Sequence, residues 1–348
     1  MTVLLIAAAA WLFVEATRVP VIGVLGLLCL ALAYAVRPRL GRIPKKAVVL
    51  TRESHPRTFE LLDRLGHDVG GPAFDRVALT RDINAGTSRV GVRRTRVLYL
   101  GVPLWNCMDW NERTGLLGHE LGHQVNGDVR RGFFLATSIQ ALRTWIDILT
   151  PRSRLHSSIQ IVFRTVVRYP LRWVARGLLA SQLRLSSGRS RMGEYRADDI
   201  AAGLAGTEAV IRGLDTTLIA SDCLSRSVRM CLYQPEADLR SEEKRFVADF
   251  PRRQRMRLRR INQLSATSLY STHPSVHCRM VYVAAQPTSL AGSAPGASLW
   301  AGVDAELAPL IQRIGAQICE QNPHARHGGD VHWHLDATSG PVRFNPSA

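Results

Sequence analysis

The chain has 348 residues, enough for one large domain or two ordinary ones, and 46% of them are hydrophobic, enough for a substantial core. Its formal net charge of +17, carried almost entirely by arginine, favours an anionic partner, either nucleic acid or an acidic membrane surface. The sequence contains no RNP motif, zinc-finger spacing or convincing helix-turn-helix pattern, which argues against nucleic acid. Its six cysteines form no C-x-x-C pair, so we expect reduced thiols in a reducing compartment and not a disulfide framework.

The N-terminal segment is strongly apolar. Between Thr2 and Val36 its only charges are Glu15 and Arg18, and residues 19–36 form an apolar run of 18 residues, near the minimum for a membrane span. The preceding run, residues 2–14, is shorter, so the segment predicts either one transmembrane helix or a hairpin of two short ones. A cleaved signal peptide is the alternative, but no basic stretch precedes the apolar run and no clear cleavage site precedes the charges.

Five basic residues and no acidic residue follow in residues 37–46. By the positive-inside rule this segment, and everything folded after it, faces the cytoplasm. The prediction agrees with the reduced cysteines. We therefore assign residues 1–46 to a membrane anchor with a basic flank, and residues 47–285 to the main folded domain.

The first elements of that domain are a helix and two strands. Residues 54–66 carry an apolar stripe at helical spacing, and they predict a helix that stops near Gly66. Residues 74–80 and 95–101 are rich in β-formers between glycine-containing turns, and they predict strands. Residues 82–94 are predicted to join the two strands as a hairpin.

A second helix follows and carries the most informative motif. Asp109 as N-cap with Glu112 three residues later forms a capping box, and Asn126-Gly127 supplies a left-handed stop, so we predict a helix over residues 110–126. His119 and His123 lie four residues apart in "HELGH", and such residues share one helix face.

This pattern predicts a metal-assisted hydrolytic site. Both imidazoles can bind one zinc ion, and Glu120, about 100° around the helix axis, can reach a water on that ion and take its proton. Zinc suits the arrangement because a site with three protein ligands leaves one position open for water. The alternative is an ordinary solvated helix face that carries two histidines.

Residues 190–203 offer a third ligand. Glu194 and Asp198 are again four residues apart on a predicted helix. Glu194 can complete the ligand set, and Asp198 can accept the free ring N–H of a ligand histidine. Two surface carboxylates on an amphipathic helix are the alternative. Farther on, His273 precedes a proline and Arg279 follows six residues later, and both are donors that can face an oxyanion.

The ordered motifs "HELGH…NGD", "SR..E..AD" and "THPS….R" resemble those of the HtpX and CAAX-prenyl-protease family of membrane zinc endopeptidases, over residues 52–283. The resemblance implies a thermolysin-like (gluzincin) site with one zinc ion per chain. His119, His123 and Glu194 would be its ligands, and Glu120 its general base. Proteins or peptides would be the substrates.

The same resemblance implies roles outside the zinc ligands. Asp198 would orient a ligand histidine, and His273 and Arg279 match the family's donors to the transition state and the substrate carbonyl. The family also implies a short sheet whose edge strand receives extended peptides, with residues 95–101 as the candidate strand.

The interval between the two motif helices, residues 129–189, departs from the family pattern. HtpX-like members carry two further membrane spans here, but residues 132–149 contain Arg143 and Asp147, and charges at a bilayer centre are costly. Over residues 159–185 arginines recur every fourth position and form one stripe, at Arg164, Arg168, Arg172 and Arg176. The pattern favours two helices on an anionic membrane surface, with a kink at Pro170, and a solvated basic face is the alternative.

Residues 286–348 begin with a linker rich in small residues and proline. Residues 299–320 predict one more helix. The tail carries four histidines, for which we expect a disordered polar segment; a second metal site is the alternative.

These patterns predict a mainly helical α+β fold: a zincin-like catalytic domain with a short β-sheet, preceded by a transmembrane helix or hairpin. The predicted function is that of a membrane-anchored zinc endopeptidase facing the cytoplasm, which hydrolyses peptide bonds through a metal-bound water activated by Glu120. Two alternatives remain, a non-proteolytic membrane scaffold that retains the metallopeptidase fold and a basic nucleic-acid-binding protein. Every residue that the proposed hydrolysis needs is present, which argues against the scaffold. Only the net charge supports nucleic-acid binding.

Overall fold

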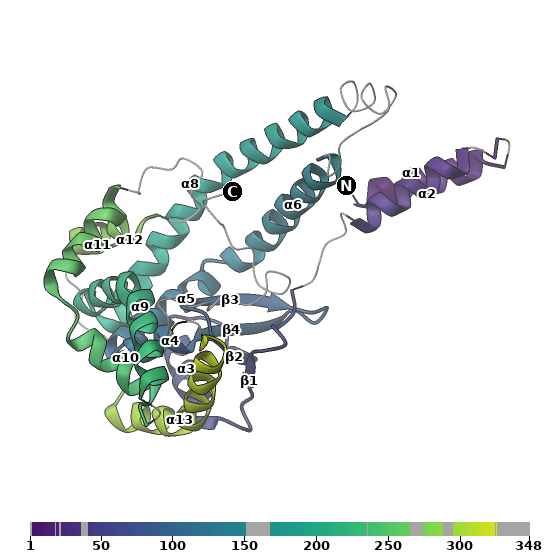
Figure 1. Ribbon diagram of the computed structural model, residues 1–348. Helices are drawn as coiled ribbons and strands as arrows, with labels where there is room; N and C mark the ends of the chain where they lie inside the picture. Colours follow the sequence, from purple (N-terminus) through teal and green to yellow (C-terminus); the bar gives the residue numbers. More distant parts are fainter. Residues whose placement is uncertain are drawn as a thin grey trace. The chain divides into compact units, whose positions relative to one another are not determined.

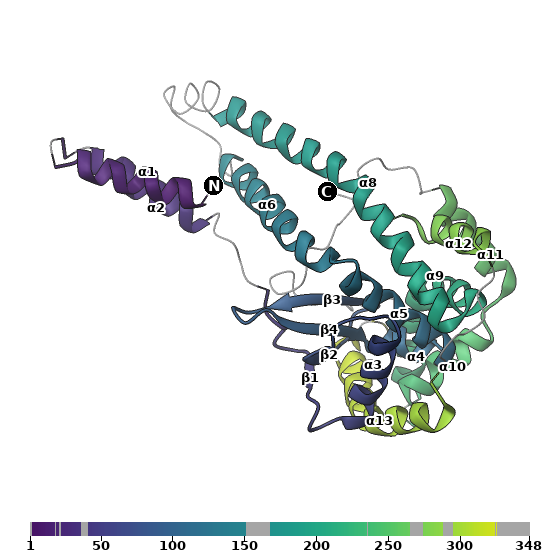
Figure 2. The same ribbon diagram turned by 180° about the vertical axis from the view of Figure 1, so that it is seen from behind.

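The structure is a computed structural model that describes residues 2–17, 19–20, 22–35, 41–150, 168–234, 236–264, 274–287, 295–323 and 325. The described residues are mainly helical with one four-stranded sheet, which agrees with the predicted α+β class (Figures 1 and 2). The chain divides into two compact units. The first comprises residues 1–39 and 130–187, and the second comprises residues 40–129 and 188–348.

The apolar N-terminus, in the first unit, forms two helices side by side, α1 (Thr2–Glu15) and α2 (Ile22–Ala35) (Figure 1). Each has 14 residues and is therefore about 21 Å long, less than the roughly 30 Å of a bilayer's hydrocarbon core. None of the helices in the described ranges combines the length and the apolar character that a membrane crossing requires. The expected transmembrane segment is not confirmed.

The interval between the motif helices contributes two helices, α6 (Asp128–Leu149) and the first half of α8 (Tyr169–Ala205). The Ser138 hydroxyl donates to Gln182 Oε1 at 3.0 Å and links them. Pro170 lies in the first turn of α8, where proline is tolerated. Residues 151–167, which include Arg164, lie outside the described residues. Because α8 runs on for 37 residues, the second helix of this interval and the helix that bears Glu194 are one element.

The sheet, in the second unit, has the order β1-β2-β4-β3, with β1 (Val48–Leu50), β2 (Arg76–Thr80), β3 (Ala85–Val90) and β4 (Thr95–Gly101). β2 and β4 are parallel, and β3 is antiparallel to β4. The segment predicted as a mere connecting hairpin is therefore itself a strand. Residues 95–101 are also not the edge strand that we expected, because β4 pairs on both sides, and β3 forms the edge instead.

The remaining helices of this unit pack on the sheet and on one another. They are α3 (Pro56–Asp68), α4 (Val102–Cys107), α5 (Trp110–Val125), α9 (Thr207–Tyr233), α10 (Leu239–Ala248), α11 (Arg252–Leu264), α12 (Val276–Ala285) and α13 (Ala297–Glu320). The predicted apolar stripe of α3 is confirmed, because Phe59, Leu61, Leu62 and Leu65 are all buried in the core.

The predicted C-terminal helix is confirmed as α13, and its apolar side is part of the same core. Trp300, Val303, Leu307 and Ile311 are buried with residues of α3, α5 and the sheet. The four histidines of the tail lie outside the described residues. The second unit therefore has one main core, to which elements from residue 50 to residue 318 contribute.

Candidate metal centre

The helix α5 has the capping features at both ends that its sequence predicts. Asp109 accepts a hydrogen bond from the Glu112 backbone N–H at 2.8 Å, and Glu112 Oε2 accepts one from the Asp109 backbone N–H at 3.0 Å. These two bonds form the capping box and satisfy amides that a helix start leaves free. Gly127, with φ of +71°, supplies the left-handed turn after the helix.

Two glycines of α5 let α8 approach closely. A Cβ at Gly122 would lie 2.8 Å from the Ala197 Cα, and one at Gly118 would lie 3.0 Å from the Ala201 Cα. Side chains at these two positions would therefore push the helices apart. The close crossing brings Glu194, 3% exposed on α8, against the histidines of α5.

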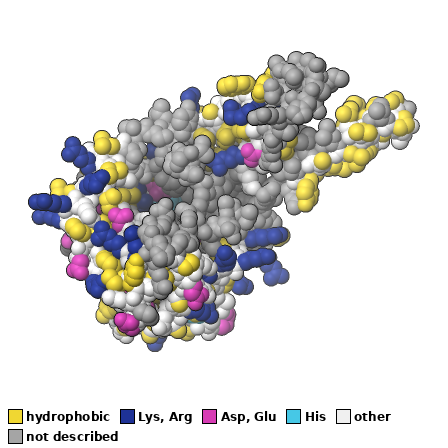
Figure 3. Space-filling model, viewed as in Figure 1, with side chains coloured by type: hydrophobic (Ala, Val, Ile, Leu, Met, Phe, Trp, Pro, Cys, Tyr) yellow, Lys and Arg dark blue, Asp and Glu magenta, His cyan; other side chains and the backbone are white. Residues whose placement is uncertain are grey.

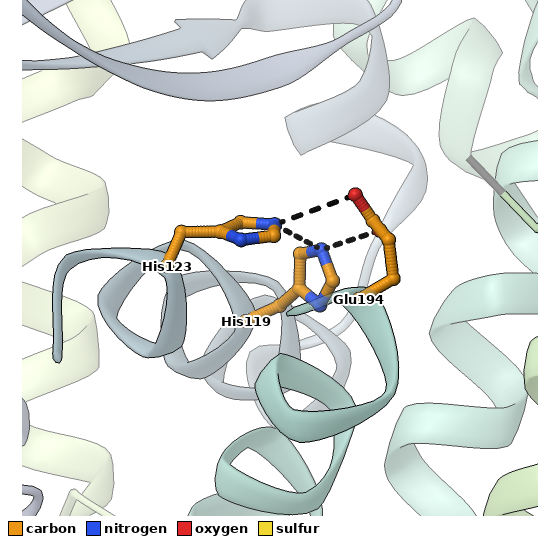
Figure 4. A group of neighbouring side chains, drawn as sticks. All are labelled: His119, His123 and Glu194. Carbon is orange, nitrogen blue, oxygen red and sulfur yellow. Dashed lines mark hydrogen bonds and ion pairs between the residues drawn. The ribbon is translucent and has the colours of Figure 1, made fainter. Parts of the chain in front are cut away.

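Three potential ligand atoms converge where the helices cross (Figure 4). The Nε2 atoms of His119 and His123 lie 3.2 Å apart, and the Glu194 carboxylate lies 3.4 Å from the first and 3.7 Å from the second. Among the described residues this trio alone forms such a cluster. Tetrahedral zinc with bond lengths of 2.0–2.1 Å separates its ligand atoms by about 3.3 Å, so two imidazoles and one carboxylate at these spacings fit that ion.

The remaining ring nitrogen of His119 is oriented by Asp198. Its Nδ1 lies 2.9 Å from Asp198 Oδ1, and Asp198 is fully buried. A hydrogen bond at Nδ1 fixes the tautomer in which Nε2 carries a lone pair toward the metal position. The predicted partner, Asp198, therefore lies where it can orient His119.

Arg279, on α12, contacts both Asp198 and Glu194. Its Nε and Nη2 donate to the two carboxylate oxygens of Asp198 at 2.8 and 2.6 Å, and its Nη1 lies 3.6 Å from Glu194. Such a bidentate guanidinium–carboxylate pair fixes orientation as well as charge. Asp198 is held between Arg279 and His119, and Arg279 Nη2 also lies 3.0 Å from Nδ1 and 3.3 Å from Nε2 of His119, beside the ligand trio.

The pKa values reflect this charge arrangement. Burial raises the pKa of Asp198, but the hydrogen bonds from Arg279 and His119 outweigh it and the net pKa is lowered. Burial and Arg279 lower the pKa of His119, but Asp198 and Glu194 outweigh them and raise it to about 9. A metal ligand must be neutral imidazole, so metal binding here would displace a proton from His119.

Glu120 lies between the two histidines on α5 and is 6% exposed. Burial lowers the pKa of Arg279, but Asp198, Glu194 and Glu120 raise it, and the net pKa is raised. Glu120 therefore lies close enough to Arg279 to raise the pKa of that guanidinium. His273, the other predicted donor, lies outside the described residues.

Sequence reasoning missed two features of the site. The first is the Gly118/Gly122 pair, whose four-residue spacing was a readable signal of a close helix contact. The second is the pairing of Arg279 with Asp198, for which the sequence holds no signal because 81 residues separate the two.

The model of one protein family, described as peptidase family M48, matches residues 61–285, which is well over half of the chain. The matched range contains every residue of the centre described above. No curated protein and no solved structure matches the chain.

Proposed function

The chain belongs to peptidase family M48, a family of metallopeptidases, and on that premise we propose that it is a zinc-dependent endopeptidase anchored at a membrane. The observation that carries the proposal is the convergence of two imidazole nitrogens and one carboxylate within 4.8 Å of one another. The proposal agrees with the predicted resemblance to HtpX-like and CAAX-prenyl proteases.

His119, His123 and Glu194 would hold one zinc ion per chain. When bound, zinc would lower the pKa of a coordinated water to about 7 and polarise the substrate carbonyl. The two imidazoles leave the ion most of its positive charge, and Glu194 contributes one negative charge. Asp198 and Arg279 both contact His119, and Arg279 also contacts Glu194, so both ligands would be oriented before the metal arrives.

Glu120 would serve as the general base. Its carboxylate would accept the proton of the attacking water and then deliver that proton to the nitrogen of the leaving amine. Its position between the two histidines on α5 and its near-complete burial favour this role. His273 stays the predicted donor to the oxyanion. The same predicted role of Arg279 would have to rely on Nη1, because Nε and Nη2 already bind Asp198.

The substrate would bind as an extended chain along β3. This edge strand pairs with β4 on one side, and in the described ranges its other side carries only a bridge between Val90 and Gly41. β3 packs against α5, the helix that bears both histidines. A peptide that added to this edge would run past the metal centre with its backbone hydrogen-bonded and its side chains alternating, as in other β-augmentation complexes.

The membrane anchor would be the α1–α2 hairpin. Its helices expose large apolar side chains, among them Val3, Trp11, Val14, Val24 and Leu27, which water solvates poorly. The basic residues 37–46 that follow would stay in the cytoplasm and place the metal centre there. The arginine-bearing part of α8 would contact anionic lipid.

Zinc binding is the first test. The full-length protein, stripped with a chelator and dialysed against zinc, should retain about one zinc per chain, and Glu194→Ala should lose most of it. Glu208→Ala, which removes an exposed carboxylate of α9, is the matched control and should bind as the wild type does. Zinc retention in Glu194→Ala equal to the wild type would refute the site. One bound zinc without cleavage of an unfolded protein such as casein would support the scaffold alternative.

A further inference from the structure

The helix α11 is unusually basic. Its sequence, RRQRMRLRRINQL, contains six arginines and no acidic residue, and none of its residues is buried. The peptidase chemistry uses no residue of this helix. Most surface helices of soluble proteins mix both signs of charge, so a purely basic exposed helix points to a partner.

One face of α11 is occupied by the protein itself. Arg255 Nη1 and Arg259 Nε donate to the two oxygens of Asp215 on α9, at 2.7 and 2.6 Å. Asn262 Oδ1 accepts from the His277 backbone N–H at 2.8 Å, and Leu258 packs against the cluster around Phe250. These contacts fix which way the helix faces.

The opposite face is exposed and combines charge with apolar groups. Arg253, Arg257 and Arg260 fall within an arc of about 60° at 100° per residue, whereas Arg252, exposed in the first turn, lies about 80° outside that arc. No acidic side chain in the described ranges pairs with these four arginines. Met256, Ile261 and Leu264, which are 60%, 51% and 74% exposed, lie on the same outer side. In Figure 3 dark-blue side chains gather over α11 with yellow ones among them.

We propose that this face of α11, which we call the arginine face, docks the second unit onto an anionic lipid surface. Arg253, Arg257 and Arg260 would contact lipid phosphates, and the three aliphatic side chains would enter the headgroup region. An acidic nucleic-acid or protein surface would match the arginines but would leave the exposed aliphatic groups without a partner, and the face carries no aromatic side chain on which bases could stack. The proposal does not depend on zinc or on peptidase activity.

The test measures each arginine separately, because the apolar N-terminus can itself hold the full-length chain in vesicles of any composition. The protein is reconstituted into phosphatidylcholine vesicles with or without 30% phosphatidylglycerol and treated with phenylglyoxal, which modifies free guanidinium groups. Peptide mass spectrometry then gives a rate at each arginine. We expect modification of Arg253, Arg257 and Arg260 to slow at least fivefold on anionic vesicles and to recover in 0.5 M salt, which screens the attraction.

Arg64 on α3 and Arg313 on α13 are the internal controls, because both are exposed and lie off the arginine face; their rates should stay constant. In Arg257→Glu/Arg260→Glu the protection of Arg253 should disappear, whereas Arg64→Glu/Arg313→Glu, with the same change in net charge, should preserve it. Equal rates on neutral and anionic vesicles would overturn the proposal. Protection by duplex DNA or polyglutamate on neutral vesicles, without protection by anionic lipid, would overturn it as well.

Discussion

Glu243 is a buried carboxyl that the metal centre does not use. It is fully buried, its Oε2 accepts a hydrogen bond from Asn106 Nδ2 at 2.8 Å, and its Oε1 has no hydrogen-bond partner among the described residues. Burial raises the pKa of Glu243 well above its ordinary range, and the bond from Asn106 only partly offsets this. The folded protein therefore holds this proton to a higher pH than an unfolded chain does.

The raised pKa predicts how Glu243→Gln changes stability with pH. An unfolded glutamate loses its proton near pH 4.5, whereas the folded protein keeps it to a higher pH, so the free energy of unfolding falls as pH rises above 4.5. Glutamine removes this dependence. In urea unfolding at pH 5, 6, 7 and 8, the stability of the variant relative to the wild type should rise as the pH rises. Glu236→Gln, at an exposed position, controls for the lost carboxyl. A stability difference that stays constant over this range would contradict the assignment.

At the scale of residues, the sequence predicts those parts of the metal centre that depend on the spacing of residues within one helix. His119 and His123 follow from the four-residue period of one helix, and Glu194 with Asp198 from the same period on another. Which face each helix turns to the other does not follow from either pattern. The contact of Arg279 with Asp198 depends on where a third helix, α12, packs, and no local pattern encodes that position.

Between elements, the geometry of the centre depends on how closely α5 and α8 cross. In Gly122→Ala the new methyl group would meet the Ala197 backbone, so the helices must separate and the ligand atoms with them. We expect a loss of about 1–3 kcal/mol in the free energy of unfolding, typical of overpacking, and a weaker affinity for zinc. Gly203→Ala on α8 is the matched control, because nothing lies within 4 Å of its Cβ position. It should stabilise the helix by about 0.5–1 kcal/mol. Unchanged zinc affinity in Gly122→Ala would contradict the account.

α13 is tied to the motif helix by a buried ion pair. Asp304 accepts hydrogen bonds from Arg113 Nη1 at 2.9 Å, Arg240 Nη2 at 2.7 Å and Trp110 Nε1 at 2.9 Å. Arg113 is 1% exposed, so its charge has no access to water. Asp304→Ala should lower the free energy of unfolding by about 3–5 kcal/mol, because it leaves that charge buried and unpaired.

Glu320→Ala, at an exposed position of the same helix, is the control and should change stability by less than about 0.5 kcal/mol. A loss of less than about 1 kcal/mol in Asp304→Ala would show that α13 does not anchor α5. The apolar stripe of residues 299–320 predicts the helix itself. It cannot tell which surface covers that stripe, because many apolar faces in the chain are equally suitable partners.

For the molecule as a whole, the strand order was the least predictable feature. Residues 74–80 and 95–101 have strand-forming sequences, but β-branched and aromatic residues do not say which neighbour a strand pairs with. Residues 85–90 contain glycine, serine and threonine and therefore resemble a turn, yet they form the edge strand. The edge predicted to bind substrate was wrong for this reason, and β3 takes its place in the proposed function.

Residues 37–46 predict the orientation of the proposed membrane anchor. A reporter enzyme that is active only outside the cytoplasm, fused after Lys46, should be silent, because the five basic residues resist transfer across the bilayer. A reporter active only inside the cytoplasm, fused at the same position, is the positive control. Strong activity of the first reporter would overturn the topology and the expectation of reduced cysteines.

The most direct test of the peptidase mechanism is Glu120→Gln, because this substitution keeps the size of the side chain and removes only its ability to accept a proton. The full-length variant and the wild type would be loaded with zinc, their metal content measured, and their rates of casein cleavage compared at saturating substrate. The account predicts the same zinc content in both and a kcat about 10²- to 10⁴-fold lower in the variant, which is the usual contribution of a general base. A zinc-loaded Glu120→Gln protein whose kcat stays within about tenfold of the wild type would contradict it.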